Sequence, residues 1–214
     1  MTNNHNEAET GGEEVFSFSR QELRGMLRAP MRTVDLLLGE RRRFAMNVAQ
    51  EHRLPSLLLV LAVATAAFAL PFGAVLGLDG FWRVAALLLG ALAICLPSLH
   101  VFGKYLGARL SWTQTLAVSL AATAVTSLFT LAFAPILGFL RATMTTSAVI
   151  TPKGMAVVLL VCAFAAGIGQ LFRLLRGEAV LRGLGPSLGL VLIPWLALYL
   201  FITVRLASVL GLIA

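Results

Sequence analysis

The stretch LPSLLLVLAVATAAFALPFGAVLGL, residues 54–78, runs without a single charged side chain. A helix needs about 20 apolar residues to cross the hydrocarbon core of a bilayer, because the core is about 30 Å thick and each residue adds about 1.5 Å. Residues 54–78 reach this length. We therefore predict that they form a transmembrane helix, and this helix sets the fold class for the rest of the chain.

Four further apolar runs follow, and short charged segments separate them. Each is long enough, or nearly so, for one crossing, and none is long enough for two crossings and a turn. Only helices and closed barrels satisfy all backbone hydrogen bonds in lipid. We therefore predict an all-α, polytopic membrane protein, a bundle of five transmembrane helices over 54–214, with spans at about 54–78, 84–103, 112–140, 154–175 and 187–212.

The composition supports this class. The 214-residue chain is 58% hydrophobic and 13% charged, whereas soluble domains are about 45–50% apolar and about 25% charged. A soluble fold could not cover its surface with so few charges. The net charge of +7 is spread over the N-terminal region and the loops, which suits anionic lipid and does not indicate nucleic-acid binding.

The region before the first run divides into two parts. Residues 1–19 are polar and acidic, and we expect a disordered tail. Residues 20–53 are predicted to form a cytoplasmic amphipathic segment, which Gly39 can divide into two helices. The arginines Arg41, Arg42 and Arg43 lie beside an apolar stripe and are candidate lipid or partner contacts. The segment either lies in the headgroup layer or is a solvated helix that packs on the cytoplasmic loops or on another protein. The stripe comprises Met31, Val34, Leu38, Ala45 and Val48.

The basic residues predict the orientation, because cytoplasmic loops are enriched in Lys and Arg. With the N-terminus in the cytoplasm, eight early arginines and the loops after the second and fourth spans lie on that side. The opposite side receives only Arg83, Arg141, Lys153 and Arg205. We expect the C-terminus outside. The abundance of Ala, Leu, Gly and Arg suggests a bacterial source, so the location predicted is the cytoplasmic membrane of a bacterium.

No enzyme motif is present, and the apolar runs contain no Asp or Glu. Ser98 and His100 are spaced so that their side chains point to different faces of a helix, which does not suit a catalytic pair. Cys95 and Cys162 form no metal-ligand pattern and are expected to behave as small hydrophobic residues. We predict no catalytic residue, no bound metal and no cofactor.

Three polar residues near or within the spans are candidate sites. His100 lies near the cytoplasmic end of the second span, where it either bonds a neighbouring backbone group or acts as a protonatable gate or headgroup contact. Arg205 is the one charge well inside a run. It either snorkels to the outer interface, pairs with Asp79 on the same side, or contacts a substrate or partner.

Residues of small size recur every four positions on the third span, at Ser119, Thr123 and Ser127. Such a stripe lets helix backbones approach closely. Prolines occur within the spans, and we interpret them as packing devices, since no ion ligands accompany them.

The layout resembles the Yip family of Rab-interacting membrane proteins and their prokaryotic relatives. The segment LRAPMRTVDLLLGE (27–40) resembles the family's amphipathic lead-in, and LHVFGKYLGARLSWTQTLAVSLAATAV (99–125) resembles its basic loop between spans two and three. The resemblance implies five spans, a cytoplasmic N-terminus and a non-enzymatic role.

The leading hypothesis is a membrane organiser or accessory subunit that binds a lipid or protein partner, or a second copy of itself, through its N-terminal segment and bundle surface. The alternative is a small transporter or channel component for a neutral or apolar substrate.

Overall fold

A computed structural model describes residues 20–28, 31–49, 54–77, 79–105, 111–143, 152–177 and 187–212. These residues form eight helices and contain no strand, which confirms the all-α prediction for this part of the chain. The predicted tail 1–19 lies outside the described residues. The helices are α2 (Arg20–Arg28), α3 (Met31–Leu38), α4 (Arg41–Ala49), α5 (Leu54–Leu76), α6 (Gly80–Tyr105), α7 (Trp112–Thr143), α8 (Pro152–Gly177) and α9 (Ser187–Val209).

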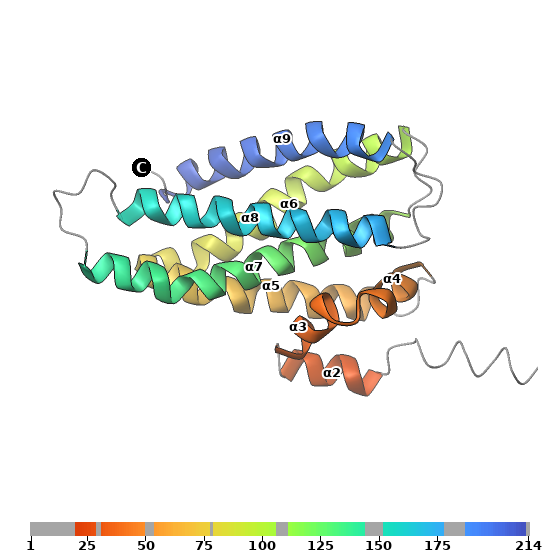
Figure 1. Ribbon diagram of the computed structural model, residues 1–214, viewed down its shortest axis with the longest axis horizontal. Helices are drawn as coiled ribbons and strands as arrows, with labels where there is room; N and C mark the ends of the chain where they lie inside the picture. Colours follow the sequence, from red (N-terminus) through yellow and green to blue (C-terminus); the bar gives the residue numbers. More distant parts are fainter. Residues whose placement is uncertain are drawn as a thin grey trace, which may run out of the picture.

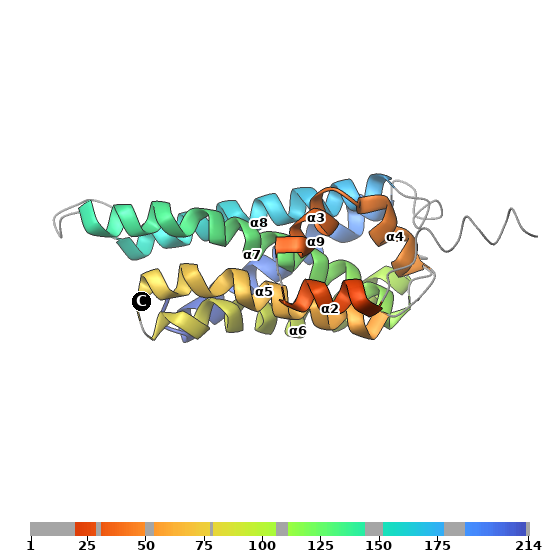
Figure 2. The ribbon, with the colours of Figure 1, turned by 90° about the horizontal axis from the view of Figure 1, so that it is seen from below.

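The five long helices α5–α9 run side by side along the long axis of the molecule (Figure 1). α5 packs against α6 and α7, α8 packs against α7, and α9 packs against α6. We call the end where α5 and α7 begin the near end, and the end where they finish the far end. The helices α2–α4 cover one side of the bundle towards the near end (Figures 1 and 2).

Three of these helices are long and apolar enough to cross a membrane, namely α5, α6 and α7. In α8 and α9, shorter apolar stretches are described at Gly154–Gly169 and Ala197–Val209. The chain therefore has the character of a helical membrane protein. The helix bounds of α5–α9 lie within a few residues of the predicted spans, while five membrane crossings stay a prediction.

The prolines do not break these helices. Pro71, Pro97 and Pro135 lie inside α5, α6 and α7, and each helix continues on both sides of its proline. Neighbouring helices and hydroxyl side chains can take up the backbone groups that proline frees in a membrane helix. The arrangement agrees with prolines that serve packing.

Glycines set the α5–α6 junction. A Cβ at Gly73 would lie 2.5 Å from the carbonyl oxygen of Gly80, so these two backbones meet where no side chain fits. Gly77 between the helices has a φ of 125°, a conformation that residues other than glycine rarely adopt. The sharp turn between the two helices therefore depends on glycine at both positions.

The hydroxyl stripe on α7 is buried. Ser119 and Thr123 donate hydrogen bonds of 2.8 and 2.9 Å to the carbonyls of Thr115 and Ser119, and Ser127 donates one of 2.8 Å to Ala124. Each hydroxyl group thus has a hydrogen-bond acceptor within its own helix. The small side chains keep this face of α7 narrow, so a neighbouring helix can approach it closely. This agrees with the predicted close packing along α7.

Two arginines complete helix ends at the far end. Arg83 Nη1 on α6 donates a 2.9 Å hydrogen bond to the carbonyl of Leu210, directly after α9, and Arg141 on α7 donates to the carbonyl of Val75 near the end of α5. The last carbonyls of a helix lack partners within the helix and carry partial negative charge. Both arginines therefore join neighbouring helices by satisfying those carbonyls.

Candidate functional site: the docked N-terminal helices

The helices α2–α4, which we call the N-terminal unit, pack against the side of α5 and α7. Its buried apolar side chains belong to the same core as α5 and α7, where Leu57 and Ala121 are also buried. Each such side chain contributes about 1.5–3 kcal/mol when it leaves water. The unit is therefore held to the bundle by this chain's own apolar residues, which are Leu23, Leu36, Leu37, Phe44 and Val48.

The apolar stripe predicted for this segment is wrong at its start. Met31 is 64% exposed, whereas Leu36 and Leu37 are only 2% exposed. Within α3 the buried face carries Thr33, Leu36 and Leu37 instead. The predicted break at Gly39 is confirmed, since the amides of Gly39 and Glu40 both bond to the carbonyl of Asp35 at the end of α3. A single helical period cannot continue through that turn, so α3 and α4 present separate faces to the bundle.

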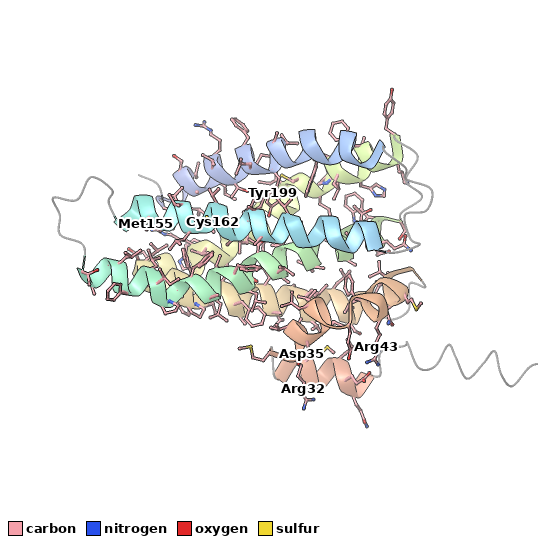
Figure 3. All side chains as sticks on the ribbon, in the orientation of Figure 1. Arg32, Asp35, Arg43, Met155, Cys162 and Tyr199 are labelled. Atoms are coloured by element: carbon pink, nitrogen blue, oxygen red, sulfur yellow. The ribbon has the colours of Figure 1, made fainter. Side chains whose placement is uncertain are left out.

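Arg43 is the centre of the only ion-pair network among the described residues. Its Nη2 lies 3.2 Å from Glu22 Oε2 on α2, and its Nη1 lies 3.1 Å from Glu40 Oε2. Partial burial by itself would lower the pKa of Arg43, but the hydrogen bonds and charges of Glu40 and Glu22 outweigh it, so the pKa is raised. Figure 3 shows Arg43 reaching from α4 towards α2.

This geometry gives Arg43 a positioning role within the N-terminal unit, because its two carboxylate partners belong to that unit. The predicted use of Arg43 as a lipid or partner contact stays a prediction beside this role. The side chains of Arg41 and Arg42 lie outside the described residues, and their predicted role stays a prediction.

A second link joins α4 to the start of α7. Ser111 and Gln114 form a reciprocal cap, in which Gln114 Oε1 accepts from the Ser111 amide at 2.9 Å and Ser111 Oγ accepts from the Gln114 amide at 3.3 Å. Gln114 Nε2 then donates to the carbonyl of Val48 at 3.2 Å. The spacing Ser-x-x-Gln before an apolar run is the sequence signature of such a cap, so the sequence could have predicted the cap, although not the contact with Val48.

His100 lies between α6 and α7 at the near end. Its Nδ1 is 3.2 Å from Thr115 Oγ1, and its ring meets that of Trp112 edge-on with centroids 4.8 Å apart. Thr115 Oγ1 also lies 3.0 Å from the carbonyl oxygen of Ser111, to which it donates, so the His100 ring, the Thr115 hydroxyl and the start of α7 form one hydrogen-bonded group. The partner is a side chain rather than the backbone group expected, and it holds the ring across the two helices.

Asp79 and Arg205 are both exposed at the far end, and within the described residues no ion pair joins them. The alternative in which they pair is therefore not what the structure adopts. The arginines that join helices at this end are Arg83 and Arg141 instead.

The two cysteines form no disulfide. Cys95 is buried and Cys162 is exposed, and both are free thiols.

The outer face of the N-terminal unit is polar. Arg32, Asp35 and Glu40 are exposed, and Figure 3 shows Arg32 pointing away from the bundle. Among the described residues no group of three or more His, Cys, Asp or Glu side chains could hold a metal ion. What the unit offers is thus a charged surface fixed on an apolar bundle.

Comparison of the chain with protein-family models, with curated proteins and with solved structures finds no match.

Proposed function

We propose that this chain is a non-enzymatic membrane protein that organises a membrane assembly or serves as an accessory subunit, as its resemblance to the Yip family implies. The N-terminal unit is the surface that recruits a protein or lipid partner, and we favour a protein. The observation that carries the proposal is the docking of α2–α4, which buries Leu36, Leu37 and Phe44 on the bundle while Arg32 and Asp35 stay exposed.

The lengths of the helices support a position of this unit at the membrane surface. α7 has 32 residues, or about 48 Å, and exceeds a hydrocarbon core of about 30 Å by about 18 Å. Charged side chains such as Arg32 and Asp35 are costly inside hydrocarbon. The excess length therefore belongs at the near end, where the N-terminal unit then lies in or above the headgroup layer.

In this arrangement all five long helices cross the cytoplasmic membrane of a bacterium. The near end and the N-terminal unit face the cytoplasm, and the far end with the C-terminus faces outwards. The distribution of Lys and Arg supports this orientation. The unit's buried apolar residues dock on this chain, so its exposed charges, with Met31 beside them, remain for a partner.

A photo-crosslinking amino acid at position 35 of the full-length chain, expressed in cells, tests the proposal. We expect one protein adduct of discrete size, formed in the cytoplasm. The same amino acid in place of Val158, an exposed position on α8, is the control and should not give that adduct.

Charge reversal separates specific from incidental contact. Arg32→Glu should abolish the adduct from position 35, while Arg205→Glu, which reverses an exposed arginine at the far end, should leave it unchanged. Adducts to lipid alone would identify the membrane surface as the partner. Absence of both kinds of adduct would count against the N-terminal unit as a recruiting surface.

A further inference from the structure

A crevice separates α8 from α9 in the half of the bundle towards the far end. Its floor is formed by α5 and α6, through residues such as Phe72 and Leu88, and its walls by Leu160 on α8 and Val204 on α9. The crevice is partly open to the outside, and its cavity volume is about 40 Å³. It exists because α8 packs on α7 while α9 packs on α6, so these two outer helices stand apart.

The described residues of the lining are apolar apart from Thr203. Its hydroxyl proton is already donated to the carbonyl of Tyr199 at 2.7 Å. At the mouth, Val161 and Val204 are each 45% exposed. A crevice of this kind offers van der Waals contact to a hydrocarbon chain and no hydrogen-bond donor to a polar solute.

The crevice covers much of one leaflet. On α9 it extends from Leu200 to Ala207 and on α8 from Ala156 to Phe164, rises of about 10 and 12 Å, and half of a hydrocarbon core is about 15 Å. Its inner end is closed by Phe164, whose ring stacks on that of Tyr199 with centroids 4.7 Å apart. The space therefore runs from the far-end surface to about the middle of the bundle.

Positive charge lies around its outer end. Arg205 is exposed on α9 directly after Val204, and Arg83 reaches the carbonyl of Leu210 next to the lining residue Leu212. With Arg141, these arginines outnumber Asp79, the described acidic residue of this end. Arg205 lies about 6 Å below the end of its helix, from where an arginine side chain can reach the headgroup layer by snorkelling.

We propose that the α8–α9 crevice binds one acyl chain of a phospholipid from the leaflet opposite the N-terminal unit, with Arg205 holding the phosphate. The proposal rests on the membrane placement given above. It is independent of whether the N-terminal unit recruits a partner, because the crevice residues lie in the far half of α8 and α9, whereas α2–α4 lie towards the near end (Figure 1).

The test is native mass spectrometry of the full-length chain, delipidated in mild detergent and titrated with palmitoyl-oleoyl phosphatidylglycerol. We expect one lipid to bind with higher affinity than the rest. Val204→Trp places a large ring at the mouth of the crevice and should weaken this site at least about tenfold. Phe201→Trp enlarges a side chain that is 64% exposed and does not line the crevice, and should leave the site intact.

Arg205→Gln should weaken the same site several-fold and leave its stoichiometry at one. A Val161→Trp variant blocks the opposite wall and guards against a folding defect peculiar to α9, and size-exclusion chromatography checks every variant. Equal binding by Val204→Trp, Val161→Trp and Phe201→Trp would overturn the proposal, as would a wild-type protein without a distinct lipid site. Alkaline carbonate extraction of cell membranes tests the membrane placement separately.

Discussion

Gly167 lies in α8 where it meets α7, and its replacement by alanine measures how much stability this close approach provides. A Cβ at position 167 would overlap Thr126 Oγ1 and lie 3.0 Å from the carbonyl oxygen of Ala122. Thr126 donates a 3.0 Å hydrogen bond to that same carbonyl. The added methyl group therefore forces either a rotation of Thr126, which breaks this bond, or a separation of the two helices.

The magnitude follows from two opposing effects. Overpacking in a well-packed core costs about 1–3 kcal/mol, whereas Gly→Ala inside a helix gains up to about 1 kcal/mol. Gly169→Ala is the matched control, because a Cβ there meets nothing within 4 Å. The propensity gain is common to both variants, so we expect Gly167→Ala to be less stable than Gly169→Ala by about 1–3 kcal/mol.

The assay is thermal unfolding of both variants in the same mild detergent, followed by size-exclusion chromatography. For a chain of this size, 1 kcal/mol corresponds to about 2–4 °C in Tm, so the two variants should differ by several degrees. Thr126→Ala in the Gly167→Ala background should recover part of the loss. Equal Tm values for Gly167→Ala and Gly169→Ala would refute the close approach of α7 and α8.

Three further predictions concern the ends of the bundle. Leu37→Ala removes a side chain that is 2% exposed in the docked unit and should cost about 2–5 kcal/mol of docking energy. We expect faster proteolytic cleavage of the chain after α2, while α5–α9 stay intact. Unchanged cleavage would contradict the docking. Reversing Asp79 and Arg205 together should give the sum of the single effects in a double-mutant cycle, since the two form no pair, and a coupling above about 0.5 kcal/mol would show one. Gly211→Ala should lower stability by about 1 kcal/mol, because Gly211 has a φ of 68° in the turn that ends α9, a conformation that costs alanine about that much; an unchanged Tm would contradict this turn.

The helical part of the fold could be predicted closely from apolar run length. The run at 54–78 became α5 over Leu54–Leu76, and the run at 112–140 became α7 over Trp112–Thr143. Charges marked the ends of the predicted runs less well. α6 begins at Gly80, before Arg83, because the guanidinium reaches the carbonyl of Leu210 and so has a partner within the helix bundle.

The candidate site was harder to predict, and the reasons are specific. The break at Gly39 could be predicted, but the stripe through Met31 was continued across it, whereas α3 docks by the face of Leu36 and Leu37 and α4 by a face of its own. Arg43 belonged to a cluster that suggested lipid contact, yet its partner Glu22 lies 21 positions earlier in the chain. Local pattern contains no information about such a pair.

By itself the sequence determined the class of this protein, because apolar runs of this length without charge are stable as helices in a membrane and cannot be covered as soluble surface. It also determined which helix face would be narrow, through Ser119, Thr123 and Ser127. Only the tertiary structure decided that α2–α4 lie on α5 and α7, and that α8 and α9 stand apart around a crevice. These features depend on contacts between residues distant in the chain, which helical periodicity does not specify.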